Sequence, residues 1–279
     1  KIDYILLAAY LLIMLGMGWF LRVRGQRDEE YFLAGRRMGW LPIGISVMIT
    51  VFSAINYVAL PNEIFSHGLY VLISLPVFLL VAWPISRCWI PFFHAMRLTS
   101  AYEYLEYRFD VRVRCLAGAV FILWRLFWIA TALYATGSIL SVLTGLPVAW
   151  IILTAGITAT FYTFLGGMRA VMWTDVAQFS ILFGGIALGV CYACREAGGF
   201  AGVLTAAHQG GRLRPFLPFD PSFFSWNPTL RITFWSGLIG TFVAFLARYG
   251  ADQVVMQRYF TARSLIMARR GIWFNAVIS

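Results

Sequence analysis

Residues that commonly do enzyme chemistry are few and scattered in this sequence. His67, His94 and His208 lie in separate segments, so local spacing supports neither a zinc site nor a nucleophilic triad. Cys191 and Cys194 form a C-x-x-C, but near the end of an apolar run they are better explained as small apolar helix residues than as a redox or metal pair. No phosphate-binding glycine loop of the ATPase type is present. The sequence therefore predicts neither an enzyme nor, within these residues, a primary pump.

Asp175 follows a glycine pair in the stretch FLGGMRAVMWTDVAQ, where an apolar run is expected to begin. A carboxylate near the amino terminus of a helix is stabilised by the helix dipole, and that role alone would explain the residue. A carboxylate at this depth can also act as an oxygen ligand or exit-path relay for a small cation. The residues alone favour the cap.

Arg125 lies inside the apolar run FILWRLFWIATALYATG, several residues from either end. A guanidinium within a bilayer is costly unless it meets a partner or water, so a functional role is the default hypothesis. Its partner would be an anionic group of a substrate or a carboxylate on another helix. The alternative is that the side chain snorkels to the nearby interface. Trp128 on the same run is a candidate to line an aqueous cavity, although packing is the commoner role of aromatic residues.

The run LPIGISVMITVFSAINYVALPNEIFSHG differs from the others because polar residues interrupt it and Pro61 follows. Helical spacing places Thr50, Ser53 and Tyr57 near one face. Backbone groups at bilayer depth must all be satisfied, so an interrupted helix there needs a compensating partner such as an ion or substrate. Discontinuous helices of inverted-repeat transporters use such carbonyls to bind cations. On spacing alone, hydrogen bonds to a neighbouring helix are the favoured alternative.

The elements that would carry these residues are membrane-spanning helices. Of the 279 residues, 61% are hydrophobic and 12% charged, which leaves too few polar groups for a globular surface. About 20 helical residues cross the hydrocarbon core. Runs of that kind are expected at residues 2–21, 41–65, 69–85, 115–140, 147–165, 171–193 and 231–247, with an eighth starting at 271. We therefore expect a single all-α transmembrane domain over residues 1–279 whose solvent is the lipid bilayer.

The net charge of +10 also fits a membrane protein better than one that binds nucleic acid, because the basic residues lie in short segments between apolar runs. Alternating these segments between the two faces gathers most arginines on one side, which the positive-inside tendency makes the cytoplasm. The amino terminus is then expected outside. The first run is too long for a signal peptide. Because the pattern stops within an apolar run at residues 272–279, we expect a piece of a longer chain.

Four stretches resemble the sodium/solute symporter family in order and spacing, and together they cover nearly the whole chain. They are YFLAGRRMGW, ALPNEIFSHG, FLGGMRAVMWTDVAQ and DQVVMQRYFTARSLIMARR. The resemblance implies a LeuT-type inverted-repeat fold: one extra helix, a complete first repeat, and the start of a second repeat whose remainder is absent. It also implies a secondary active symporter that imports a small organic solute with sodium as the co-transported ion.

The resemblance also assigns site residues. It implies a sodium site at the backbone carbonyls of Ile49 and Phe52, and it places Asp175 in a second sodium site or on the exit route of the ion. Ser53, Asn56 and Tyr57 match the substrate-facing part of the interrupted helix, and Asp252 and Gln253 match a pair near the inner gate. Arg125 and Trp128, which the residues alone already single out, complete the candidate substrate-binding set.

The substrate class is less well defined. Asn56 stands where sugar-transporting relatives have glutamine, so a sugar is not indicated. The PNE stretch resembles a pattern of relatives that carry vitamins, monocarboxylates or anions, and with Arg125 it favours an organic anion. Two alternatives to a working symporter remain. The first is a sensor, because the module also resembles the membrane input domain of some signalling kinases. The second is a fragment that is inactive by itself, because further sodium ligands are expected beyond Ser279.

Overall fold

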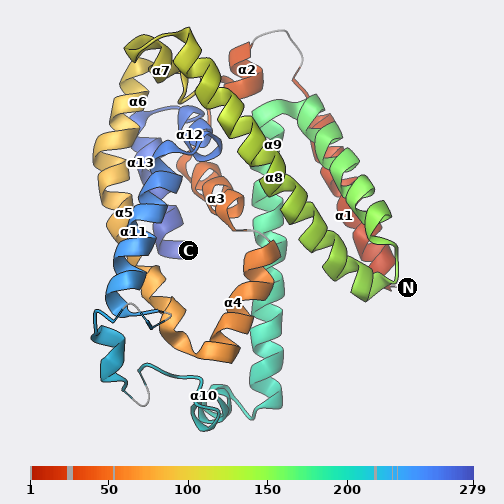
Figure 1. Cartoon of the computed structure of the whole chain (residues 1–279). Helices are drawn as coiled ribbons and strands as arrows, with labels where there is room; N and C mark the ends of the chain where they lie inside the picture. Colours follow the sequence, from red (N-terminus) through yellow and green to blue (C-terminus); the bar gives the residue numbers. More distant parts are fainter. Residues whose placement is uncertain (1, 24–27, 53, 217–218, 228, 231) are drawn as a thin grey trace.

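The computed structural model describes residues 2–23, 28–52, 54–216, 219–227, 229–230 and 232–279, and this part of the chain is helical without an extended strand. Figure 1 shows long helices running between an upper and a lower end. The helices are α1 (Ile2–Phe20), α2 (Asp28–Leu33), α3 (Trp40–Val51), α4 (Ala54–His67), α5 (Ser74–Pro84), α6 (Ile90–Met96), α7 (Glu103–Arg108), α8 (Val111–Thr144), α9 (Val148–Glu196), α10 (Phe200–Gln209), α11 (Phe234–Ala251), α12 (Gln253–Phe260) and α13 (Leu265–Ile278).

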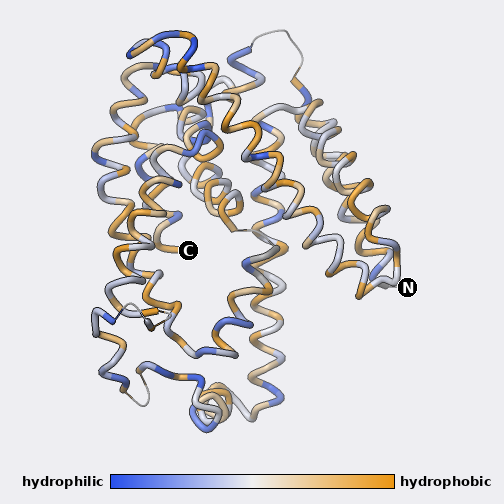
Figure 2. Tube along the Cα trace, viewed as in Figure 1, coloured by the Kyte–Doolittle hydropathy of each residue, from blue (hydrophilic) through white to orange (hydrophobic). Residues whose placement is uncertain are grey.

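Four helical segments within the described residues are long and apolar enough to cross a membrane. They are Asp3–Phe20, Leu69–Met96, Val111–Thr144 and Val148–Glu196. Figure 2 shows hydrophobic residues along these segments, with hydrophilic residues gathered mainly at the two ends of the molecule. Large side chains such as Trp124, Phe127 and Phe164 remain exposed on them, as expected of surfaces that do not face water.

Two helices are interrupted, the first within the predicted span 41–65 and the second just beyond the predicted span 231–247. In the first, α3 ends at Val51 and α4 begins at Ala54, and between them Phe52 is extended with φ −85° and ψ 116°. In the second, α11 ends at Ala251 and α12 begins at Gln253, and Asp252 between them is also extended, with φ −68° and ψ 120°. Each interruption frees backbone groups that a continuous helix would pair.

The 49-residue helix α9 is two antiparallel legs joined at Gly167. A straight helix of this length would reach roughly 74 Å, more than twice the thickness of a hydrocarbon core. Gly167 has φ 55° and ψ −154°, which is non-helical, and a Cβ there would lie 2.6 Å from the backbone oxygen of Tyr31. The two legs occupy the expected runs 147–165 and 171–193, with no loop between them.

The lower end is covered by the long polar segment that follows α9. This segment lies between the expected spans 171–193 and 231–247 and was predicted to be a loop, but it contains the helix α10. The backbone N–H of Leu69 donates to the carbonyl of Arg214 at 2.5 Å, and the Tyr70 hydroxyl donates to Asp220 at 2.8 Å. Hydrogen bonds from Ser222 and Tyr70 hold the pKa of the Asp220 carboxyl below its usual range.

Small residues let α3 approach its neighbours. A Cβ on Gly44 would lie 2.7 Å from the backbone oxygen of Gly271 and 2.7 Å from a ring carbon of Phe274, both on α13. A Cβ on Gly271 would in turn meet Ile43 at 2.8 Å. Close backbone approach through small residues is the usual way that membrane helices gain packing contacts. The position of α3, and with it the first interruption, therefore depends on this contact.

We expect Gly44→Ala to destabilise the protein by about 1–3 kcal/mol, because the added methyl group has no room against the α13 backbone. Gly156→Ala is the matched control, since nothing lies within 4 Å of a Cβ there and alanine favours a helix by roughly 0.5–1 kcal/mol. Thermal unfolding of the two purified variants measures the difference. Equal melting temperatures would show that the α3–α13 approach is not tight.

Candidate ion and substrate site

The first helix interruption borders a cavity of about 200 Å³ that α11 also lines. Val51, Phe52 and Asn56 line it from the first interruption, while Arg248 and Tyr249 line it from the last turn of α11. The terminal carbonyls of α3 are no longer taken up by a continuing helix, so backbone oxygens become available near this cavity. Such oxygens suit a hard cation, and the adjoining side chains suit a solute.

Ile49 and Phe52 line a second cavity, of about 420 Å³. Its polar wall comes from Tyr10 and Gln178, and the Gln178 amide donates to the Tyr10 hydroxyl at 3.1 Å. Of the two positions assigned to sodium, Phe52 thus lies beside both cavities and Ile49 beside the second. Ligation by their carbonyls stays a prediction.

Asp175 is buried in a three-residue cluster with Ser46 and Arg258, at 8%, 0% and 5% exposure. Arg258 Nη2 lies 3.1 Å from Asp175 Oδ2, and Arg258 Nε donates to the Ser46 hydroxyl at 2.6 Å. The Ser46 hydroxyl in turn donates to the same carboxylate oxygen. Asp175 lies two turns beyond Gly167, so it does not cap the second leg of α9 as the residues alone suggested.

Arg125 forms an ion pair with Asp252, the extended residue of the second interruption. Its Nη2 lies 2.8 and 3.0 Å from the two carboxylate oxygens, and the side chains are 20% and 26% exposed. Asp252 Oδ1 also accepts from the Val254 N–H at 2.9 Å, which caps α12. Of the three partners considered for Arg125, the structure therefore has the carboxylate on another helix.

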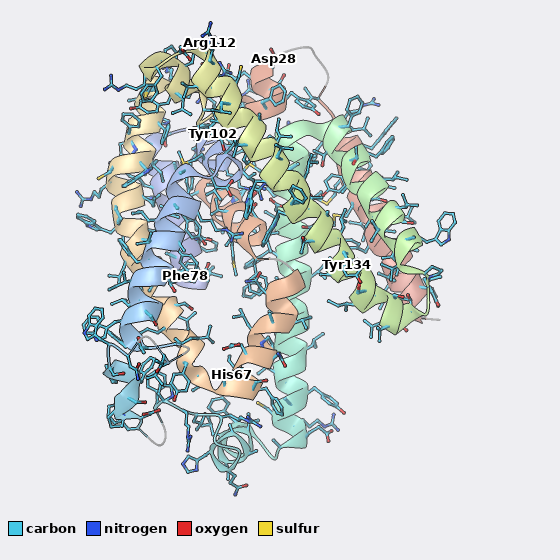
Figure 3. All side chains as sticks on the ribbon, viewed as in Figure 1. Asp28, His67, Phe78, Tyr102, Arg112 and Tyr134 are labelled. Carbon is cyan, nitrogen blue, oxygen red and sulfur yellow. The ribbon has the colours of Figure 1, made fainter. Side chains whose placement is uncertain are left out.

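Gln253 attaches the same junction to the segment before α7. Its Oε1 accepts from the Ala101 N–H at 2.6 Å and from the Ser100 hydroxyl at 3.3 Å. Tyr102, labelled in Figure 3 near the upper end, lies beside this contact. Burial raises the pKa of the Tyr102 hydroxyl, and the charge of Asp252 adds to the effect. The first residues of α12 are thus tied to the segment that leads into α8.

The remaining predicted substrate residues divide into two groups. Trp128 lines a cavity of about 840 Å³ between α8 and α11, together with Arg125 and Asp252. Ser53 lies outside the described residues, and for Tyr57 only the backbone, within α4, is described. The structure therefore gathers Trp128, Arg125 and Asp252 at one cavity, and Asn56 and Phe52 at another.

Three polar residues of the site were missed by sequence reasoning. Ser46 stands four positions before Thr50 in an otherwise apolar stretch, which was a usable signal. Arg248 and Arg258 were assigned to a basic segment at the membrane surface because they are charged. The structure places Arg258 in the buried cluster, and Arg248 beside both the 200 and the 840 Å³ cavities.

Comparisons with known proteins agree with this geometry. Residues 31–278 match the model of the family described as the sodium:solute symporter family. Sodium-coupled monocarboxylate transporter 1 of Homo sapiens is 32% identical over 99% of this chain and 45% of its own length. The Homo sapiens sodium/iodide cotransporter is 34% identical over 99% and 42%, and the Oryctolagus cuniculus sodium-dependent multivitamin transporter 34% over 94% and 41%. The chain thus spans less than half the length of these relatives.

A solved structure matches the fold over the whole chain. It is a substrate-bound outward-open state of a Na+-coupled sialic acid symporter, with a TM-score of 0.92, 30% sequence identity, and coverage of 100% of this chain and 58% of that one. The predicted all-α, LeuT-type fold is confirmed by this match.

We expect Asp175→Leu and Arg258→Met each to destabilise the protein by about 3–5 kcal/mol, because each leaves one buried charge without its partner. The double variant removes both charges and is expected to cost far less than the sum of the two. Thermal unfolding of the three variants tests this coupling. Additive losses would mean that the two side chains do not depend on each other.

Proposed function

We propose, since this chain belongs to the sodium:solute symporter family, that it is part of a secondary active transporter that imports a small organic solute with sodium. The observation that carries the proposal is the pair of interrupted helices whose extended residues, Phe52 and Asp252, line two cavities that both border on Arg248. Backbone oxygens freed inside a membrane need a partner, and a co-transported cation is such a partner.

The sodium ion would bind at the carbonyls of Ile49 and Phe52, with Asp175 on its route to the cytoplasm. Arg258 and a cation compete for the same carboxylate oxygen of Asp175, because both need its negative charge. Sodium can therefore reach Asp175 only after α12 moves and withdraws the guanidinium. This order, first the inner opening and then the ion at Asp175, suits an exit-path residue.

The side chains that hold α12 form the inner gate in this proposal. Arg125 holds Asp252, Ser100 and Ala101 hold Gln253, and Asp175 holds Arg258. These contacts hold α12 in the upper part of the molecule in Figure 1, near α7. We take this end as the cytoplasmic side, with the amino terminus outside, and release of solute and ion requires the contacts to part.

The proposed solute is an organic anion, of which monocarboxylates are the favoured class. The relatives whose names include monocarboxylate, iodide and multivitamin support an anionic substrate. Ser53, Asn56, Tyr57 and Trp128 are the proposed lining of its path. The membrane potential contributes about 2.3 kcal/mol per net charge per 100 mV, so it helps to drive accumulation of a monovalent anion when two sodium ions accompany it. With one sodium ion no net charge moves, and the sodium concentration gradient alone drives uptake.

Uptake into proteoliposomes that hold the full-length protein tests the function. Labelled small organic anions are supplied with and without an inward sodium gradient. We expect accumulation above the external concentration only with the gradient. Equal uptake in both conditions, by a protein shown to be folded, would contradict sodium coupling.

We expect Asp175→Asn to weaken sodium dependence, raising the half-saturating sodium concentration by roughly tenfold, because the exit-path carboxylate loses its charge. This variant leaves Arg258 unbalanced, so Asp175→Asn/Arg258→Gln is measured beside it to keep the cluster neutral. The half-saturating concentration comes from initial uptake rates. Unchanged sodium affinity and transport in both variants would refute the ion role of Asp175.

A further inference from the structure

The cavity of about 840 Å³ between α8 and α11 carries an unbalanced positive charge. Arg125, Arg248 and Asp252 are the charged residues that line it. Arg125 and Asp252 neutralise each other through their ion pair. Arg125 keeps one buried donor, Nε, without a hydrogen-bond partner among the described residues, but its charge is already matched. The excess charge of the cavity is therefore that of Arg248.

Arg248 has neither an ion pair nor a hydrogen bond from its side chain within the part of the chain that the structure describes. Its guanidinium carbon lies 5.7 Å from the ring centroid of Trp128, so one face rests on an aromatic ring. It is half-buried on α11, one turn before the second interruption. An arginine at this depth is costly unless a counter-charge or water meets it, and none of the described carboxylates does so.

The position of Arg248 connects the two binding cavities. It lines the larger one with Trp128 and Asp252, and the smaller one with Phe52 and Asn56 at the first interruption. Phe78 of α5, labelled in Figure 3, packs on Phe245 one turn before Arg248, with ring centroids 4.4 Å apart, and so helps to hold this stretch of α11. A charged group bound to Arg248 would thus lie beside both helix interruptions.

We propose that Arg248, rather than Arg125, binds the anionic group of the transported solute, and that this solute is a monocarboxylate. The inference rests on the proposed transport function. A guanidinium offers a planar pair of donors that matches a carboxylate. One carboxylate neutralises the single excess charge, whereas a dianion or a neutral solute leaves the cavity charged. The apolar wall formed by Trp124, Trp128, Ala244 and Ala247 suits a short hydrocarbon part.

The experiment compares sodium-driven uptake of labelled pyruvate by the reconstituted full-length protein and three variants. Arg248→Gln is expected to raise KM for pyruvate about ten- to hundredfold, with a smaller change in the maximal rate. Arg248→Lys keeps the charge but loses the planar pair of donors, so its KM for pyruvate should lie between those of the unmodified protein and Arg248→Gln. Arg112→Gln is the matched control, because Arg112, labelled in Figure 3, is an exposed arginine at the start of α8 that lines neither cavity, and it should leave KM unchanged.

A neutral competitor separates charge recognition from a structural role. Pyruvamide should compete weakly with pyruvate in the unmodified protein, and the preference for pyruvate should be lost in Arg248→Gln. Normal pyruvate uptake with unchanged KM and preference in Arg248→Gln would overturn the inference while leaving the transport function intact. Sodium-driven uptake of neutral solutes but of no monocarboxylate would overturn it as well. Absence of any sodium-driven uptake would overturn both proposals.

Discussion

Backbone polar groups cannot remain unpaired in the hydrocarbon of a bilayer, and the rest of this structure depends on that constraint. The chain meets it with continuous helices except at Phe52 and Asp252, where two helices stop and restart. At the second point Asp252 itself caps the restarted helix. At the first, the freed groups lie beside cavities lined by Asn56 and Gln178. Backbone groups that are free to bind an ion or a solute are thus found at two positions far apart in sequence.

In the proposed mechanism the short helix α12 is the inner gate beside those interruptions. Two ion pairs of opposite polarity hold it. Asp252, which caps α12, binds Arg125 of α8, and Arg258 within α12 binds Asp175 of α9. Because both pairs exclude much of the solvent, each partner is costly to leave alone, so the contacts favour states in which α12 is either fully seated or displaced as a unit. A cation that competes for Asp175 would favour the displaced state, and this links the ion to the gate.

The membrane fold could be predicted from the sequence because an apolar run of spanning length is recognisable without knowing which helix it packs against. The interrupted helix was also visible, since Ser53 and Asn56 break the apolar pattern of residues 41–65. Pairings were beyond sequence reasoning: Arg125 could meet a substrate, a carboxylate or the interface, and only the fold brings Asp252, 127 positions away, to it. Asp175 was interpreted as a cap because the helix was expected to begin near residue 171, whereas it begins directly after Gly167. Arg258 is basic like its surface neighbours, and nothing local marks it as buried.

The central claim is that α12 closes the inner side of the cavities beside the two interruptions and moves away during transport. Distances between spin labels at Arg112 and Arg263, in the full-length protein reconstituted in lipid, test it most directly, because both side chains are exposed and flank the gate. The account predicts a short distance with sodium alone and a second, longer population when sodium and a transported solute are both present. A single distance that is unchanged by sodium and solute would contradict it.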